Sequence, residues 1–280
     1  MTIFQKIKHY GWLFIQYFSL IFFSFAALLP VVSCVITAFK TKEEYESTNV
    51  MTLPENWLNF SNFIQVWEDA NMGRAFINSA IVLVFVVAGS VMVGSMIAYV
   101  LNRFTFPGNG LIRSLFLFAT LLPGIAMQVA TYQLMYQIGF INHLYGYIIL
   151  SMGTDVISIY IFIQFFENIP VSLDESAFMD GASYFTIFFK ILFPLLKPAM
   201  VTVMILKGVG TYNEYYNASL YLTGDQLTVS MALYTFVGPL GSQFNLICAG
   251  VIMSLIPALV VFLIFQKQIY SGMTAGAVKG

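Results

Sequence analysis

Few side chains in this sequence have the types and spacing needed for chemistry. The two cysteines, Cys34 and Cys248, lie inside apolar runs, and the two histidines, His9 and His143, have no acidic or thiol neighbours at ligand spacing. A structural metal site needs about four such ligands, and this cysteine placement does not predict a disulfide. Catalytic patterns such as His-Glu-x-x-His or a paired serine and histidine are absent from the sequence. We therefore expect no enzyme activity, no catalytic residue and no metal site.

ATP chemistry is not expected in this chain either. The phosphate loop of ATP-hydrolysing proteins has the pattern Gly-x-x-x-x-Gly-Lys-Ser/Thr, and the sequence does not contain it. The segment 207–211, KGVGT, has related residues in the wrong order. We expect no cofactor in this chain, so ATP and its magnesium ion would have to be bound by a partner subunit.

The composition is that of a membrane protein. Hydrophobic residues make up 59% and charged residues 9% of the 280 residues, and the mean hydropathy is +0.82. Soluble domains are ~45–50% apolar and ~25% charged. A spanning helix takes ~20 apolar residues, so we expect an all-α integral membrane protein with about six transmembrane helices. The net charge of -1 excludes a nucleic-acid partner bound through bulk basicity.

The amino terminus has some features of a lipoprotein signal. Lys6 and Lys8 precede a long apolar run, and residues 31–34, VVSC, have the look of a cleavage site. However, the apolar run from Tyr10 to Phe39 is about twice as long as a signal-peptide h-region, and it continues past Cys34. We therefore interpret it as the first spanning helix.

Six apolar segments give the expected spans. Pro30 in the first segment predicts a kink, and the Pro-Gly pair at 123–124 predicts a break in the third. In the second segment, Ser90, Gly94 and Ala98 recur at every fourth position, which lets another helix approach closely. The expected spans are Trp12–Ala38, Phe76–Leu101, Leu111–Gln137, Tyr147–Phe166, Pro198–Tyr221 and Phe244–Phe265.

Charge predicts the orientation in the membrane. With the amino terminus inside, eight basic residues fall on the cytoplasmic side and three fall outside, which agrees with the excess of Lys and Arg in cytoplasmic loops. The eight are Lys6, Lys8, Arg103, Arg113, Lys190, Lys197, Lys267 and Lys279, and the three are Lys40, Lys42 and Arg74. We expect both termini in the cytoplasm. The acidic, aromatic-rich loop at about 40–75 should then rest on the extracytoplasmic surface of the same membrane.

The segment Leu173–Pro194 is a polar interruption between two spans. Ser172 and Glu175 have the spacing of a capping box, which predicts a short helix that begins just after Pro170. Gly181 can adopt the left-handed conformation that ends a helix. Ser183 can then cap a second helix that runs until Pro194.

The same segment resembles the Glu-Ala-Ala loop of permease subunits of ABC importers. The matching residues, at the family's spacing, are Glu175, Ser176, Ala177, Gly181, Ile191 and Pro194. Two departures are mild: Ser176 replaces a usual Ala, and Phe193 replaces a usual Leu. The terminal segment Gly272–Gly280 is similar to the end of maltose-type permeases, and Asn213-Glu214 adds to the likeness. The resemblance implies a type I ABC importer permease fold, with one permease domain over 1–280 and a coupling arm at about 167–197.

The resemblance also implies a function and a set of partners. In that family the arm docks into a separate ATP-hydrolysing subunit, whose closure switches the permease between inward-facing and outward-facing states. We expect a non-catalytic permease subunit of an ATP-driven sugar or oligosaccharide importer in a bacterial or archaeal plasma (inner) membrane. The expected partners are a second, non-identical permease subunit, two ATP-binding subunits, an extracytoplasmic substrate-binding protein and membrane lipid.

Roles within the arm follow from the matching positions. The resemblance implies that Glu175 faces a basic group of the ATPase and that Ala177 is the small docking residue. The full set expected to couple to the ATPase is Glu175, Ser176, Ala177, Asp180, Gly181 and Pro194, with Asp180 bracing the turn at Gly181 and Pro194 ending the arm. From the residues alone, Glu175 could instead only cap its own helix.

Lys207 is the first candidate for the substrate path. It lies ~14 Å along the fifth span, near the middle of the bilayer, where a charge is costly and usually faces a cavity or a partner. We expect Lys207 to favour an anionic or strongly hydrogen-bonding sugar, unless it extends to the cytoplasmic edge instead. We interpret Asp155 as interfacial, without a role. The other path candidates, Tyr212, Asn213, Glu214, Tyr216 and Asn217, suit sugar rings but are explained equally well by helix packing.

Two other functions stay open. The protein could be an ABC importer permease for another polar solute. It could also be an ion-coupled secondary carrier, which needs coupling-ion carboxylates in its spans. Only Glu214 and Lys207, with Asp155 as a marginal third, are available as charged groups for such a carrier, and a carrier would leave the arm unexplained.

Overall fold

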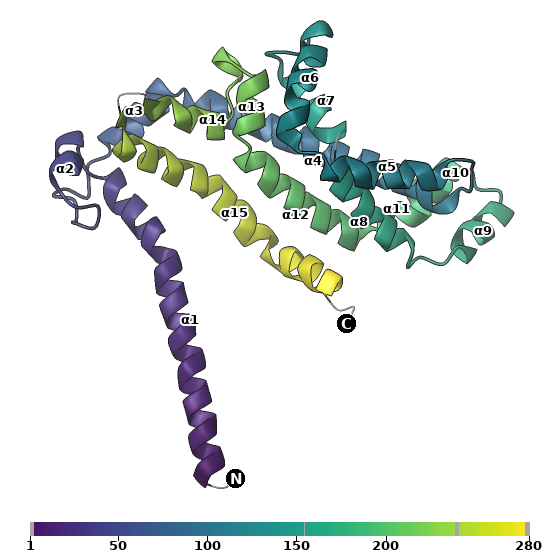
Figure 1. Cartoon of the computed structure of the whole chain (residues 1–280), viewed down its shortest axis with the longest axis horizontal. Coiled ribbons are helices and arrows are strands. Elements are labelled where there is room, and N and C mark those ends of the chain that lie inside the picture. The colour runs from purple at the N-terminus through teal and green to yellow at the C-terminus, as the bar shows by residue number, and fades with distance from the viewer. Residues whose placement is uncertain (1–2, 154, 239–240, 278–280) are drawn as a thin grey trace. The chain divides into compact units, whose positions relative to one another are not determined.

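The computed structural model describes residues 3–153, 155–238 and 241–277, which form helices joined by turns and one two-stranded hairpin (Figure 1). The chain divides into two compact units, Met1–Asn71 with Leu233–Ala258 and Met72–Ala232 with Leu259–Gly280. The single permease domain expected over 1–280 stays a prediction.

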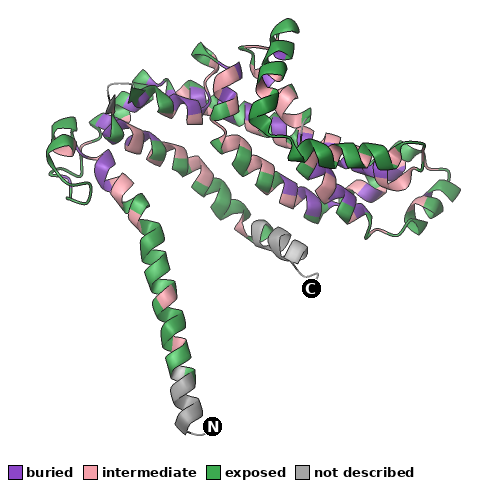
Figure 2. Ribbon diagram, in the orientation of Figure 1, coloured by how far each residue is buried: buried purple, intermediate pink, exposed green. Residues whose placement is uncertain are grey.

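The first unit begins with α1 (Ile3–Ala38), which is exposed along most of its described length (Figure 2). At 1.5 Å per residue this helix is about 54 Å long, more than the ~30 Å of a bilayer's hydrocarbon core. Pro30 lies inside α1 and does not end it. The remaining elements are α2 (Lys42–Ser47), α3 (Ser61–Asp69), η3 (Tyr234–Phe236), the antiparallel strands β1 (Val237–Gly238) and β2 (Gly241–Ser242), and the first part of α15 (Phe244–Ala277).

Buried polar contacts order the loop at 40–75. The ammonium group of the fully buried Lys40 donates hydrogen bonds to a hydroxyl and a carbonyl oxygen of residues 48–49, at 2.9 and 2.7 Å. The amide of Asn62 in α3 donates to the carbonyls of Ala38 and Lys40, at 2.8 and 2.7 Å. Asn245 in α15 donates to the Asn62 oxygen at 2.9 Å. These contacts hold the loop to the end of α1 and to the start of α15.

The second unit starts with the long helix α4 (Met72–Arg103), against which α7, α8 and α12 pack. The small residues predicted to allow close approach are confirmed in that role. Ser90, Gly94 and Ala98 are all buried, and a β-carbon added at Gly94 would lie 3.4 Å from Ser158 and Phe162 of α8. The elements after α4 are α5 (Asn109–Leu121), α6 (Gly124–Gln137), α7 (Leu144–Gly153), α8 (Val156–Phe166), α9 (Ser172–Met179), α10 (Tyr184–Thr186), η1 (Ile187–Leu192), α11 (Phe193–Leu195), α12 (Lys197–Asn213), α13 (Tyr216–Tyr221), η2 (Gly224–Gln226) and α14 (Val229–Leu233).

Candidate spans among the described residues are either long helices or bent pairs. Gly11–Ala38, Met72–Arg103 and Phe244–Gln268 are long and apolar enough to cross a membrane, and up to six segments qualify if each bent pair is one span. The pairs α5–α6, α7–α8 and the stretch Tyr184–Leu195 with α12 bend by 106°, 43° and 74°. The break predicted at the Pro-Gly pair is confirmed between α5 and α6.

The expected fifth span, Pro198–Tyr221, was wrong as a continuous helix. The helix α12 ends at Asn213, and α13 begins at Tyr216. Glu214 between them has an extended backbone, and its carboxylate accepts a hydrogen bond from the Asn217 N–H at 3.0 Å. The glutamate side chain therefore supplies the acceptor that starts a new helix.

Candidate functional site

The arm folds as a helix, a turn and a second helical stretch. The helix α9 is followed by Gly181 at φ +83°, in the left-handed region, so the predicted glycine turn is confirmed. The Ser183 hydroxyl accepts a hydrogen bond from the Thr186 N–H at 3.3 Å, which confirms the predicted cap. Helical turns then continue through α10, η1 and α11 to Leu195.

The predicted capping box at Ser172 and Glu175 was wrong. The cap residue of α9 is Val171, and no side chain caps this helix. The Pro170 carbonyl already accepts from the Leu173 N–H at 3.3 Å, and the Val171 carbonyl accepts from the Glu175 N–H at 3.1 Å. The first turn therefore forms before Ser172, whose hydroxyl is no longer at the capping position. The alternative that Glu175 only caps its own helix loses its basis.

The second stretch contains a π-helix directly before a proline. Pro194 lies in the first turn of α11, immediately after η1. A proline ring clashes with the carbonyl four residues earlier, here that of Lys190, and the wider turn of a π-helix gives the ring room. The stretch ends at Leu195, one residue beyond Pro194, and the bend into α12 falls at Leu196.

The two faces of α9 differ in exposure. Ala177 is only 8% exposed and belongs to the core of the second unit, so its small size lets α9 approach this chain's own core. The docking role that the resemblance implied for Ala177 has no exposed side chain to support it. Glu175, Ser176 and Asp180 are exposed, and Met179 is 86% exposed. An outer face with the carboxylates of Glu175 and Asp180 and with apolar side chains is therefore open to a partner.

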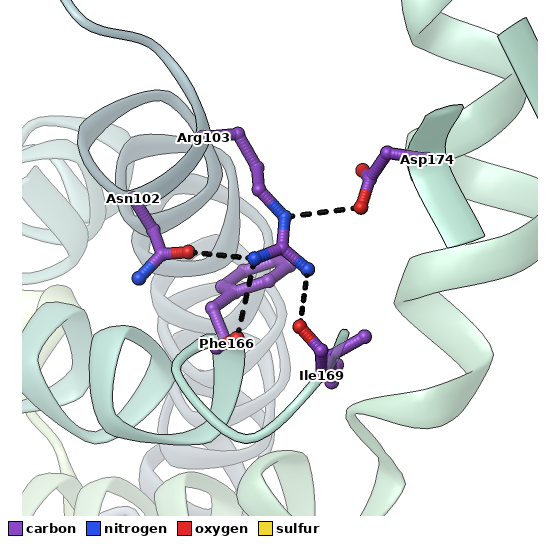
Figure 3. A network of polar contacts seen from close by, with 5 residues as sticks. All are labelled: Asn102, Arg103, Phe166, Ile169 and Asp174. Atoms are coloured by element: carbon purple, nitrogen blue, oxygen red, sulfur yellow. Dashed lines mark hydrogen bonds and ion pairs between the residues drawn. The ribbon is translucent and has the colours of Figure 1, made fainter. Parts of the chain in front are cut away.

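Arg103, the last residue of α4, connects the body of the second unit to α9 (Figure 3). Its guanidinium donates to the Phe166 carbonyl at 3.4 Å, the Ile169 carbonyl at 2.8 Å and the Asn102 side-chain oxygen at 3.0 Å. Its Nε lies 3.1 Å from Oδ2 of Asp174. The Arg103 and Asp174 side chains are only 7% and 14% exposed, so this is a buried charge pair. We call this set of contacts the Arg103 network.

The carboxylate of Asp174 is incompletely satisfied. Neither of its oxygens has a partner in hydrogen-bond geometry among the described residues, so the contact with Arg103 is an ion pair only. Burial raises the pKa of Asp174 above its ordinary value of 3.8, and this effect exceeds the opposing effect of the Arg103 charge. The nearby Glu175 raises the pKa further. The surroundings of Asp174 thus disfavour its charged form despite the ion pair.

Lys207 is paired with an acidic residue of another helix. Its Nζ lies 3.5 Å from Oδ2 of Asp155, at the start of α8, and the two side chains are 21% and 12% exposed. Asp155 also accepts hydrogen bonds from the hydroxyl and, at 3.4 Å, the N–H of Ser158. The sequence interpretation gave Asp155 no role, and this was wrong, because its carboxylate is the partner of the in-span cation; its interfacial position stays a prediction.

The other path candidates form a polar cluster around the break after α12. Both oxygens of Glu214 accept from Asn217, each at 3.0 Å. Gln128 of α6 donates to the Asn217 oxygen at 3.1 Å and accepts from the Tyr216 hydroxyl at 3.0 Å. The cluster therefore links α6 to α13. Tyr212 and Asn213 make contacts with other residues: the Tyr212 carbonyl accepts from the Ser230 hydroxyl at 2.7 Å, and the Asn213 amide donates to the Val209 carbonyl at 2.9 Å.

Sequence reasoning missed four of these residues. Arg103 was used only to count charge, Asp155 was given no role, and Asp174 and Gln128 were not considered. A signal existed for Asp155, since an acidic residue inside an apolar span needs a partner. No group of three or more His, Cys, Asp or Glu residues that could hold a metal ion occurs in the described part of the chain. The terminal motif Gly272–Gly280 lies partly outside the described residues, which end at 277.

Comparison with known proteins gives a consistent result. The family model described as "Binding-protein-dependent transport system inner membrane component" matches residues 90–275. The chain is 31% identical over 258 residues to the melibiose/raffinose/stachyose import permease protein MelC of Bacillus subtilis, covering 91% of this chain and 92% of that protein. It is 28% identical to the arabinooligosaccharides transport system permease protein AraQ of Halalkalibacterium halodurans, over 92% of this chain and 94% of that protein.

Two further similarities agree with these. The diacetylchitobiose uptake system permease protein NgcG of Streptomyces coelicolor is 29% identical, over 94% of this chain and 87% of that protein. A chain from the crystal structure of a bacterial ABC transporter involved in the import of the acidic polysaccharide alginate matches with a TM-score of 0.79. That match is 23% identical and covers 95% of this chain and 98% of the other.

Proposed function

Because the chain belongs to the family of binding-protein-dependent transport system inner membrane components, we propose that it is a permease subunit of an ATP-driven importer for sugars or oligosaccharides. The single observation that supports this most strongly is the similarity to permeases named for oligosaccharide import, over about nine tenths of the chain. Family membership makes the protein a multi-pass membrane component of a system that uses a solute-binding protein. The cargo of this chain is our inference from its relatives.

The arm is the element that we propose couples the permease to ATP hydrolysis. What supports this is the exposed outer face of α9, with Glu175 next to apolar side chains, presented by the turn at Gly181. Glu175 forms no ion pair with another described residue, so its carboxylate is free to face a cation of an ATPase subunit. ATP and Mg²⁺ are then bound by that subunit, while this chain is non-catalytic. The complex contains two ATP-binding subunits and a second, non-identical permease, and both termini of this chain face the cytoplasm.

The substrate path runs past the polar cluster of Gln128, Glu214, Tyr216 and Asn217. What supports this is a group of amides, a carboxylate and a phenol at the bent elements of the membrane region, which offers donors and acceptors to sugar hydroxyls. Lys207 remains a candidate for the path. Its pairing with Asp155 neutralises its charge within the chain, and this weakens the expected preference for an acidic sugar. Uptake of neutral and acidic sugars by a Lys207→Ala variant tests that preference, and equal losses for both count against it.

Reconstitution tests the proposed function. The complex with its ATPase and binding protein is placed in liposomes, and uptake is measured for raffinose, an arabino-oligosaccharide, diacetylchitobiose and an alginate oligomer. We expect uptake of at least one neutral sugar that requires both ATP and the binding protein. Uptake that continues without ATP and stops when ion gradients are collapsed would instead favour the secondary carrier. Absence of uptake for every sugar, with another polar solute transported, would place the cargo outside the carbohydrates.

A further inference from the structure

Arg103 lies at the end of a membrane helix but does not extend to water. Arginine side chains at such positions usually place the charged group in the aqueous phase. Here the side chain is 7% exposed and turns into the second unit (Figure 3). Burial of a cation is costly unless its donors are satisfied, so the partners of Arg103 indicate what the burial achieves.

The first partners are the backbone groups that end α8. The carbonyls of a helix's last turn have no partner within the helix, and the helix dipole makes that end favourable for a cation. The Arg103 guanidinium is such a cation: it donates hydrogen bonds to the carbonyls of Phe166, the last residue of α8, and of Ile169 in the link that follows. The Phe166 ring lies 5.8 Å from the guanidinium carbon, a cation–π distance. One side of the Arg103 network therefore fixes where α8 stops.

The second partner is the start of the arm. Asp174 lies in the first turn of α9, where the helix dipole favours a carboxylate. Residues 167–171 connect α8 to α9, and Arg103 contacts groups on both sides of this link. A single planar guanidinium thus sets the direction in which α9 leaves α8.

Stability alone does not account for the charge pair. Burial raises the pKa of Asp174 more than the Arg103 charge lowers it, so the folded protein disfavours the ionised carboxylate. Buried ion pairs are often no better for stability than apolar replacements, and a geometric role is one reason for keeping them. Successive helical residues point about 100° apart. Holding Asp174 toward the core therefore turns its neighbour Glu175 toward the outside.

We propose that Arg103 is a positioning residue of the coupling arm, which holds α9 at a fixed angle so that Glu175 and Met179 face the ATP-hydrolysing partner. This rests on the proposed coupling function of the arm. The Arg103 network then connects the membrane helices α4 and α8 rigidly to α9, so that a movement of α9 moves those helices with it.

The test uses the full complex in liposomes, with a photo-cross-linking amino acid in place of Met179. Variants Arg103→Gln and Arg103→Lys are compared with Arg74→Gln. Arg74 is a matched control because it lies in the same helix and pairs with Asp225 at 3.4 Å, but both side chains are more than half exposed. Three quantities are measured: ATPase subunit co-purified, cross-link yield per bound ATPase, and sugar taken up per ATP hydrolysed, with the sugar transported best in the panel above.

We expect the Arg103→Gln complex to show cross-link yield and uptake per ATP reduced by about two- to thirtyfold, the range for residues that modulate coupling between sites. Arg103→Lys should fall between it and the wild type, since one ammonium cannot span two carbonyls and a carboxylate as the planar fork does. Arg74→Gln should match the wild type. If Arg103→Gln does not assemble, Arg103→Lys gives the same decision.

Different outcomes overturn different claims. An assembled Arg103 variant with wild-type cross-linking and wild-type uptake per ATP would overturn the positioning role while leaving the coupling function intact. No cross-link from position 179 to the ATPase in the otherwise wild-type complex would overturn the proposed docking of α9, and the positioning role with it. A loss that Arg74→Gln shares equally would reduce the effect to a general one on α4.

Discussion

Removing the positive charge of Lys207 should leave Asp155 buried without its counter-ion. The two groups are 3.5 Å apart, and their side chains are 21% and 12% exposed, so water cannot fully replace the lost partner. Lys207→Met removes the charge and keeps a side chain of similar length. Asp155→Asn removes the other charge and keeps an oxygen that can still accept from Ser158 at the start of α8.

The size of the effect follows from the geometry. Two unit charges at 3.5 Å attract by ~5 kcal/mol at an effective dielectric constant of ~20. Desolvation of both groups offsets most of this attraction, so the net coupling should be about 1–3 kcal/mol. Breaking the pair on one side should cost about 3–5 kcal/mol, because the remaining charge is left buried. The double variant Lys207→Met with Asp155→Asn should therefore be more stable than either single variant.

Thermal unfolding of the purified complex in detergent gives the stability of the four proteins of this double-mutant cycle, which are the wild type, the two single variants and the double variant. The pair of Arg74 and Asp225 is the control, since these side chains are 51% and 70% exposed and their coupling should be close to zero. Additive effects of Lys207→Met and Asp155→Asn would refute the inference that the two charges compensate each other. Uptake then separates packing from transport: a stable double variant that no longer imports sugar would assign Lys207 to the path.

Three further predictions concern the arm and the α4 interface. Gly181→Asp places a side chain at φ +83°, a conformation that costs about 1 kcal/mol or more, and should lower ATP-driven uptake; full uptake would count against docking through the arm. For Asp174, the folded pKa is raised above 3.8, so the folded state binds the proton more tightly, and stability should fall as pH rises from 3.8 through the folded pKa. The measurement is the melting temperature of the wild type minus that of Asp174→Asn across pH 4–7, about three units above the ordinary pKa. This difference should fall as the pH rises, and an increase would contradict the raised pKa. Gly94→Ala should change stability by less than about 1 kcal/mol, because the added carbon meets Phe162 at contact distance, while Gly94→Leu should cost about 1–3 kcal/mol; equal melting temperatures for both would argue against close packing of α4 on α8.

Composition and local signals predicted most of the fold. The expected all-α permease fold and the family resemblance are confirmed by the structural match and the family match. Breaks at proline or glycine were readable because these residues act locally, as at Pro123 and Gly181. The break at Glu214 could not be predicted, because it depends on the Glu214 carboxylate accepting a hydrogen bond from the N–H of Asn217. The capping box failed because the turn at Pro170 formed first.

From the sequence, only those parts of the candidate site whose residues lie close together in the chain could be predicted. Spacing identified the arm and the polar residues near its following span, but no spacing rule links Arg103 to Asp174, which lies 71 positions later. The same holds for Lys207 and Asp155, whose pairing depends on how α8 packs beside α12. Charges in an apolar sequence signal that partners exist, while tertiary packing decides which partners they are.

The π-helix at Ile187–Leu192 also allows the number of residues in the arm to change by one. A π-turn contains about one residue more than an α-turn, so this stretch holds a residue that an unbroken α-helix would not need. Deleting one residue here would let the segment rewind as an α-helix, and because a π-turn and an α-turn each complete one rotation, the chain before it would keep its orientation relative to the chain after it. A single-codon deletion in the π-helix should therefore leave Glu175 facing its partner, whereas the same deletion in a continuous α-helix would turn the chain before it by about 100°.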